Sequence, residues 1–235
     1  RRCAVAFVLR YSHLSKALNS RRQKMSLNIN QIDEYMTALV TNARGLIRES
    51  ELLFKKKAYA RSYTLSHIAR EELAKCQILY GAGRRLIAGI DVDWKQTMKR
   101  LRDHKSKLNQ ETINNAALCF IGGNEQVYND AMQSVKASSD LRNDYKNNSL
   151  YVGVSTDGSI LCPNNVIDQA RAQRNLELAR FALMEEVNFQ SKVGKISKMD
   201  PNKLPDISKV DSMTNVEYKA VLEQFADTFR NTSKK

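Results

Sequence analysis

The 235-residue chain contains only 3 prolines and 9 glycines, fewer than a fold of many short strands and tight turns would need. This scarcity predicts long helices joined by few irregular loops. No apolar stretch approaches the roughly 20 residues that span a bilayer. We therefore expect an all-α cytoplasmic protein with no membrane partner.

The 4 cysteines are far apart in the sequence, with no CxxC pair and no histidine at metal-ligand spacing. Scattered cysteines favour free thiols in a reducing cytoplasm over a disulfide framework or a zinc site. The chain also lacks GxSxG, a Walker glycine loop, HExxH and the ExxH pairs of di-iron bundles. These absences disfavour nucleotide hydrolysis and metallohydrolysis, and we predict no cofactor and no metal site.

The net charge of +13 is concentrated at the N-terminus. Residues 1–24 contain seven Lys or Arg and no acid, which leaves 31 basic against 25 acidic residues, or +6, for the remainder. Met25 reads like a translation start, so we predict that 1–24 is a basic leader outside the native fold; a targeting peptide is the alternative. A surplus of +6 permits an RNA or acidic protein partner without demanding one.

Apolar periodicity predicts helices over about 30–55, 58–88, 111–121, 125–145 and 163–195. Residues 149–163 alternate like a strand around Asp157-Gly158, a hairpin-turn signal. The expected fold is a helical bundle of four to five core helices with this short β-hairpin insertion. We predict a bundle domain over 25–197, then a linker and a C-terminal helix, about 215–229, packed on it within 198–235.

One predicted helix, residues 58–88, has a carboxylate on its apolar side. At 100° per residue, Glu72 falls within an apolar stripe, whereas His67 and Glu71 point away from it. A buried carboxylate needs a partner. There are two candidate partners for Glu72. One is Lys75 at i+3, and the other is Arg142, the last residue on the apolar face of the predicted helix 125–145.

Three segments, taken together, resemble the AbiV family: YARSYTLSHIAREELAKCQILY (59–80), RDHKSKL (102–108) and LRNDYKNNSLYVGVSTDGSILCP (141–163). AbiV proteins are small helical bacterial proteins, related to the HEPN superfamily, that act against phage. The resemblance, from about residue 32 to 163, implies a HEPN-like bundle and an abortive-infection effector. Such an effector arrests host translation or growth through partner binding when phage is sensed. The implied partners are a phage-encoded protein trigger, RNA or the translation machinery, and a second copy in a homodimer.

HEPN nucleases cut RNA without metal, using an Arg, a polar residue and a His after four to six intervening residues. Arg142-Asn143 resembles the start of that motif, but Asn147, Asn148 and Ser149 occupy the His positions. None of these three titrates near pH 7, which argues against HEPN-type catalysis. The alternative acid–base group is His104, in the segment RDHKSKL; a structural role in capping or bridging helices is the competing interpretation.

The site predicted from this reasoning has His104 and Arg142 as the candidate catalytic residues. Its polar pocket is expected to include Glu72, Lys75, Lys107, Asn143, Tyr145 and Tyr151. Two further functions stay open beside the partner-binding effector. One is a metal-independent, HEPN-like RNA-cleaving toxin that uses His104, and the other is a non-catalytic helical scaffold protein.

Overall fold

A computed structural model describes residues 25–203, 207, 213, 214 and 216–223. The predicted basic leader, 1–24, lies outside the described residues, as do residues 224–229 of the predicted final helix. Within the described part of the chain, every helix is too short or too polar to serve as a membrane span.

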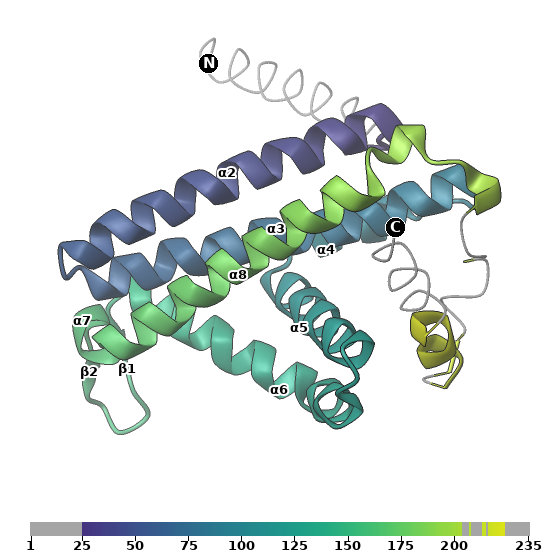
Figure 1. The fold of residues 1–235 in the computed structure, drawn as a ribbon. Coiled ribbons are helices and arrows are strands. Elements are labelled where there is room, and N and C mark those ends of the chain that lie inside the picture. The colour runs from purple at the N-terminus through teal and green to yellow at the C-terminus, as the bar shows by residue number, and fades with distance from the viewer. Residues whose placement is uncertain (1–24, 204–206, 208–212, 215, 224–235) are drawn as a thin grey trace, which may run out of the picture.

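Two long antiparallel helices begin the fold, α2 (Ile29–Lys55) and α3 (Tyr59–Ile87) (Figure 1). Asn28 starts α2 with a capping box, in which its side chain accepts from the Gln31 amide and the Gln31 side chain accepts from the Asn28 amide. The helix ends at a tight turn in which Lys57 adopts φ 60°. Both helices match their predicted ranges to within a residue or so.

Three helices follow: α4 (Trp94–Arg102), α5 (His104–Ile121) and α6 (Glu125–Leu150). Asp103 ends α4 and caps α5, because its carboxylate accepts from the Ser106 amide. The prediction began α5 seven residues too late and ended α6 five residues too early. Gly123, with φ 87°, provides the turn between α5 and α6, as the predicted Gly-Gly breaker requires.

The only sheet among the described residues is the predicted hairpin, with β1 (Gly153–Val154) antiparallel to β2 (Ile160–Leu161). It projects from one end of the bundle (Figure 1). The predicted helix 163–195 is instead two helices, α7 (Pro163–Val166) and α8 (Gln169–Val193). Asp168 caps α8 by accepting from the Arg171 amide, and this restart explains the break.

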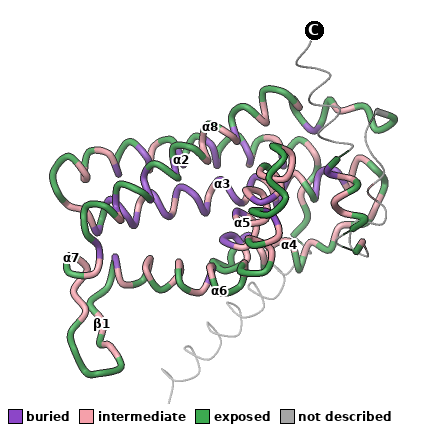
Figure 2. The backbone as a smooth tube through the Cα atoms, turned by 60° about the horizontal axis from the view of Figure 1, so that its bottom comes forward, coloured by how far each residue is buried: buried purple, intermediate pink, exposed green. Residues whose placement is uncertain are grey.

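The main apolar core lies between α2, α3 and α8, with Leu101 of α4 and Ile196 also buried in it. Buried positions run along the length of α3, the central helix of the bundle (Figure 2). No residue of α5 or α6 belongs to this main core; their own small apolar cluster contains Ala116 and Tyr128. The five long helices confirm the all-α bundle that the sequence predicted.

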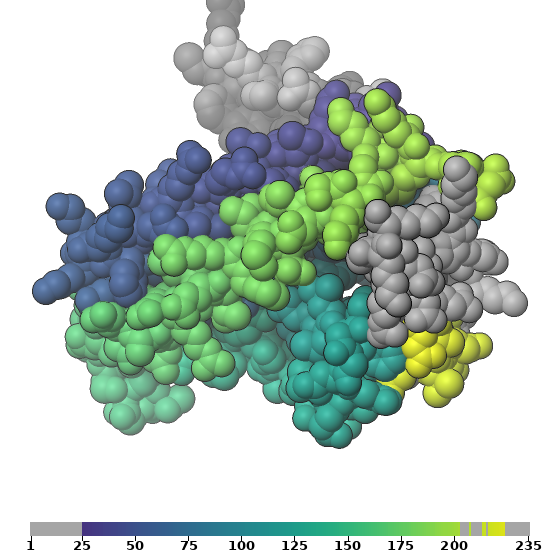
Figure 3. All heavy atoms as spheres, viewed as in Figure 1, coloured from purple at the N-terminus to yellow at the C-terminus, as the bar shows by residue number. Residues whose placement is uncertain are grey.

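Beyond α8 come short 3₁₀ turns at Ile196–Lys198 and Pro201–Lys203, the first of which buries Ile196 in the core. Residues 216–223 are helical and lie beside the tip of the α5–α6 pair, where Leu222 packs with Ala116 and Tyr128 (Figure 3). Lys219 donates to Glu125 of α6 at 2.5 Å. The described part of the C-terminal segment therefore contacts the bundle.

Candidate functional site

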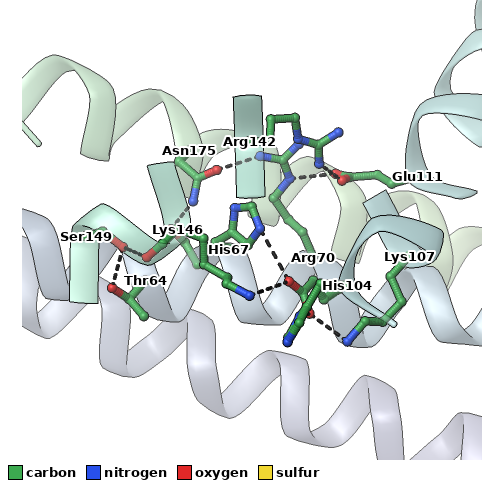
Figure 4. A network of polar contacts seen from close by, with 12 residues as sticks. Thr64, His67, Arg70, His104, Lys107, Glu111, Arg142, Lys146, Ser149 and Asn175 are labelled. Atoms are coloured by element: carbon green, nitrogen blue, oxygen red, sulfur yellow. Dashed lines mark hydrogen bonds and ion pairs between the residues drawn. The ribbon is translucent and has the colours of Figure 1, made fainter. Parts of the chain in front are cut away.

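The side of α3 that faces α5, α6 and α8 is lined by buried polar and charged side chains rather than by apolar ones (Figure 4). Small residues on α3, including Ser62 and Ser66, are fully buried and let the neighbouring helices approach closely. We call the charged and polar side chains gathered here the polar cluster. Its members are His67, Arg70, Glu71, His104, Lys107, Glu111, Arg142, Lys146 and Asn175.

Glu71 is one centre of the polar cluster. One of its oxygens, Oε2, lies 2.7 Å from Nδ1 of His104 and 2.7 Å from Nζ of Lys107, both on α5. Its other oxygen lies 3.8 Å from Nζ of Lys146 on α6 and 3.4 Å from Nε2 of His67. The side chain of His104 is 53% exposed, whereas that of Glu71 is 3% exposed. A buried carboxylate thus holds a histidine that solvent can reach.

Glu111 of α5 is the second centre. Its Oε1 accepts from Nε of Arg70 at 2.6 Å, and its Oε2 accepts from Nη2 of Arg142. Arg142 also donates to the Thr112 hydroxyl at 3.2 Å. Because Arg70 and Glu71 are consecutive on α3, the two centres are joined through the backbone of one helix turn.

Asn175 ties α8 to the same cluster. Its side-chain oxygen accepts from Nη1 of Arg70 at 2.5 Å, and its amide nitrogen donates to Ser66 and to the Tyr63 carbonyl. On the α6 side, the hydroxyls of Thr64 and Ser149 are 2.8 Å apart. Four helices therefore contribute to one connected network of hydrogen bonds.

Electrostatics fix the charge states of the two centres. Burial acts to raise the pKa of Glu71, but hydrogen bonds from His67, Lys107 and His104 outweigh it and lower that pKa. Burial likewise opposes ionisation of Glu111, yet Arg70 and Arg142 hold its pKa below the usual value. Both carboxylates are therefore ionised near neutral pH.

His67, the histidine on α3, is held in its uncharged form, unlike the two ionised carboxylates. Burial lowers the pKa of His67, although the contact of its Nε2 with Glu71 acts to raise it. His67 is therefore neutral, and its ring stacks on that of Tyr63 with centroids 5.9 Å apart.

Positive charge exceeds negative charge in the polar cluster. Two carboxylates, Glu71 and Glu111, face four cationic side chains. The cluster therefore has two surplus positive charges when both of its histidines are neutral. Burial lowers the pKa of Lys146, Glu71 opposes this shift, and Lys107 adds to it. Such a site favours binding of an anion.

The pairing of Glu72 with Arg142 was wrong. Glu72 accepts from Nζ of Lys75 at 2.5 Å and from Asn42 at 3.2 Å, so the local i+3 alternative is confirmed. Arg142 pairs with Glu111 instead. Glu72 and Lys75 each keep 15% of their side chain exposed and lie beside the polar cluster, outside its contacts.

The orientation expected for His67 and Glu71 was also wrong, because both side chains are buried. The periodicity analysis treated the polar side of α3 as the solvent side. However, α3 is covered on that side by α5, α6 and α8. The available signal was the pair of small residues, Ser62 and Ser66, one turn apart beside His67, which is typical of close helix packing.

The remaining predicted residues are divided between the site and the surface. His104 and Lys107 share Glu71, whereas Asn143 is half-buried on α6 beside Arg142. Tyr145 packs elsewhere, with the guanidinium of Arg171 4.3 Å from its ring centroid. Sequence reasoning missed several residues that complete the cluster: His67, Arg70, Glu71, Glu111, Lys146 and Asn175.

The hairpin and the residues that lead into it are exposed. Leu150, Tyr151 and Val152 are 47%, 64% and 67% exposed, so Tyr151 does not line the polar cluster as predicted. Tyr151 therefore lies at the surface, away from the packing of Tyr145. The turn itself forms as predicted, since the Asp157 carboxylate accepts from the Ser159 amide and hydroxyl. Hydrogen bonds from Ser155 and Ser159 lower the pKa of Asp157 to about 2.

The described residues contain no group of three or more His, Cys, Asp or Glu side chains that could hold a metal ion. Cys76, Cys119 and Cys162 are free thiols, and burial raises the pKa of Cys76.

Long helices packed around a central helix, with a buried polar cluster between them, define a HEPN-like helical bundle. The family model described as AbiV matches residues 31–183, which include α3, α5, α6 and every member of the polar cluster. The chain belongs to the AbiV family. Searches of the curated proteins and of solved structures gave no match.

Proposed function

We propose that this chain is a bacterial anti-phage effector of abortive infection, which acts in the cytoplasm and arrests host translation or growth through partner binding. Membership in the AbiV family supports the anti-phage function. The observation that carries partner binding is the projecting hairpin, where Val152, Val154 and Ile160 are each more than 60% exposed. Val154 pairs with Ile160 across the strands, so these side chains share one face of the hairpin.

An isolated two-stranded hairpin with an uncovered apolar face is marginally stable in water, and such a face is typical of an interaction site. We propose a phage-encoded protein trigger as its partner, and a homodimer as the state of the chain in the cell. RNA or the translation machinery is the proposed cellular target.

The test is induction in a bacterial host with and without phage, with translation rate, RNA integrity and phage yield measured together. Val154→Asp should abolish defence while leaving the melting temperature unchanged, because Val154 is 66% exposed. Val216→Asp is the matched control, since Val216 is 77% exposed on the distant C-terminal helix. Full defence by the Val154 variant would refute the hairpin as partner surface.

A second candidate, metal-independent RNA cleavage, is favoured by the contact between Glu71 and His104. A carboxylate that accepts from Nδ1–H fixes the imidazole tautomer and leaves Nε2 as a proton acceptor. His104 is the first residue of α5, and its side chain is 53% exposed, so its ring is accessible to a ligand from solvent. Lys107 and Lys146 contact the same carboxylate and supply positive charge for a phosphate.

In this candidate, Nε2 of His104 removes the proton of a ribose 2′-hydroxyl as its oxygen attacks the adjacent phosphorus. The bond from phosphorus to the 5′-oxygen breaks, and that oxygen takes a proton from water. Arg142, the other predicted catalytic residue, contacts Glu111 rather than Glu71, so we assign the two lysines the role of binding the phosphate. RNA that stays intact during arrest would exclude cleavage and leave the partner-binding proposal standing.

A further inference from the structure

The segment that follows α8 is attached to the protein at two places. Near its start, Ile196 is buried in the main apolar core, and the Asp33 carboxylate of α2 accepts from the amides of Ile196 and Ser197 at 2.9 and 3.1 Å. Farther along, residues 213, 214 and 216–223, which we call the C-terminal strap, reach the tip of the α5–α6 pair (Figure 3). One stretch of chain thus joins the main core to two helices that contribute no residue to it.

The first turn of the strap is specified by its own sequence. The Thr214 hydroxyl accepts from the Glu217 amide at 3.3 Å, and the Glu217 carboxylate accepts from the Thr214 amide at 2.7 Å. This reciprocal pair is a capping box, which starts a helix at a defined residue. The Tyr218 amide then donates to the Thr214 carbonyl at 2.9 Å, as a helical turn requires. The strap is therefore already helical where it meets α5 and α6.

The strap completes the small apolar cluster at the tip of the α5–α6 pair. Leu222 is one of the three buried members of this cluster, with Ala116 of α5 and Tyr128 of α6, and the half-buried ring of Tyr218 packs against them. Burial raises the pKa of Tyr218. Without the strap, one side of the cluster would face water, so docking of the strap removes apolar surface from water on both partners.

A lysine sets the position of the strap on the tip. Nζ of Lys219 lies 2.5 Å from the carboxylate of Glu125, the first residue of α6. The same Nζ lies 5.5 Å from the ring centroid of Tyr128 and 5.8 Å from that of Phe120. A cation within about 6 Å of an aromatic ring centroid is attracted by the ring. Apolar burial and a directed charge contact therefore hold the strap at one place.

The two helices that the strap holds are also the helices that cover the polar cluster. Arg70 and Glu71 of α3 are 6% and 2% exposed. Both form ion pairs with α5, Arg70 with Glu111 and Glu71 with Lys107. Displacement of α5 would break these pairs and admit solvent to both α3 side chains. The contacts at the tip therefore bear on access to the cluster.

We propose that the C-terminal strap is a regulatory device, which keeps α5 and α6 in place over the polar cluster and thereby restricts access to Arg70 and Glu71. The strap lies outside residues 31–183, so it is not part of the bundle that the family model matches. Residues 204–212 connect its two attachments, and such a tether favours docking within one chain. Detachment of the strap exposes the cluster while the main core stays folded. This role does not depend on what the cluster binds or cleaves.

The test is labelling of arginine side chains in the full chain by phenylglyoxal, with the modified residues located by mass spectrometry. Leu222→Asp places a charge at the buried anchor of the strap, so Arg70 should be labelled roughly tenfold faster than in the wild type. Arg180, whose side chain is 53% exposed, is the internal reference and should be labelled equally in both proteins. Lys219→Gln should give a smaller increase, because ion pairs at the surface contribute little.

Ala220→Asp is the matched control, because it adds the same charge to the same helix at an exposed position, and it should leave the labelling of Arg70 unchanged. Trp94, the single tryptophan, packs against the main core, so its fluorescence reports on that core. Its urea midpoint should be equal in the wild type and the Leu222 variant. Unchanged labelling of Arg70 in Leu222→Asp would overturn the proposal. A lower midpoint in that variant, or equal labelling in the Leu222 and Ala220 variants, would also overturn it.

Discussion

Nδ1 of His104 lies 2.7 Å from Oε2 of Glu71, which joins the first residue of α5 to a buried carboxylate on α3. If this pair cleaves RNA, His104→Ala should lower cleavage by about 10²-fold or more, the usual worth of a general base. The melting temperature should change little, because the ring is 53% exposed. Gel analysis of RNA from induced cells provides the measurement.

Lys105→Ala is the control for this variant, since Lys105 is the next residue on the same turn and its side chain is 56% exposed in a pair with Asp140. Equal RNA patterns in the wild type and the His104 variant would rule out a catalytic His104.

Glu111 is shared by Arg70 and Arg142, so its loss strands two guanidinium groups. Glu111→Gln should destabilise the fold by about 3–5 kcal/mol, the usual cost of breaking a buried pair. Urea unfolding of single and double variants should show coupling between Arg142 and Glu111. The same cycle on Arg142 and Glu72 should be additive, because these residues have different partners. Additivity in the first cycle would contradict the structure.

Lowering the pH should reduce the free energy of unfolding, because Glu71 becomes protonated. Its folded-state pKa lies below the unfolded value, so its contribution to stability is complete above the unfolded pKa of about 4.3 and is lost as the pH falls further. Urea midpoints measured from about pH 7 to about pH 3 should fall, and Glu71→Gln should flatten that fall. A Glu71 variant with an unaltered pH profile would count against this assignment.

Glu186 is a control for Glu71, because the pKa of its carboxyl group is shifted in the opposite direction. It accepts from Gln77 and Gln190, has no cationic partner among the described residues, and burial raises its pKa. Its contribution to stability is therefore present at low pH and is lost as the pH rises through the folded pKa. Glu186→Gln should stabilise the protein at neutral pH and lose that advantage in acid.

Two glycines of α3 should respond oppositely to alanine. A Cβ at Gly83 would lie 2.8 Å from Cδ1 of the buried Ile196, whereas a Cβ at Gly81 meets nothing within 4 Å. Gly81→Ala should stabilise the fold by about 0.5–1 kcal/mol, the helix-propensity gain. Gly83→Ala should destabilise it by about 1–3 kcal/mol through overpacking. Thermal unfolding of both variants checks the contrast, and a Gly83 variant as stable as the Gly81 variant would disprove this close approach.

The sequence was sufficient for the bundle, because apolar periodicity, caps and the Asp157-Gly158 turn are local signals. It was insufficient for the site. Periodicity shows which side of a helix is apolar, but it does not show that the polar side of α3 is covered by other helices. The Arg142–Glu111 contact spans 31 residues and two helices, and many carboxylates were equally plausible partners. The break before Asp168 was missed because Ile167 is apolar and fits the helical period.

The polar attachment of α5 and α6 has a consequence for motion. These helices contribute nothing to the main apolar core, and their ion pairs with α3 are those of the polar cluster. Regions with few shared apolar contacts open together below the global unfolding free energy. Amide hydrogens in α5 and α6 should therefore exchange with deuterium as one group, earlier than those of α3. We expect such an opening of the α5–α6 pair to leave α2, α3 and α8 folded, because their shared core is separate, and to expose Arg70 and Glu71 to solvent.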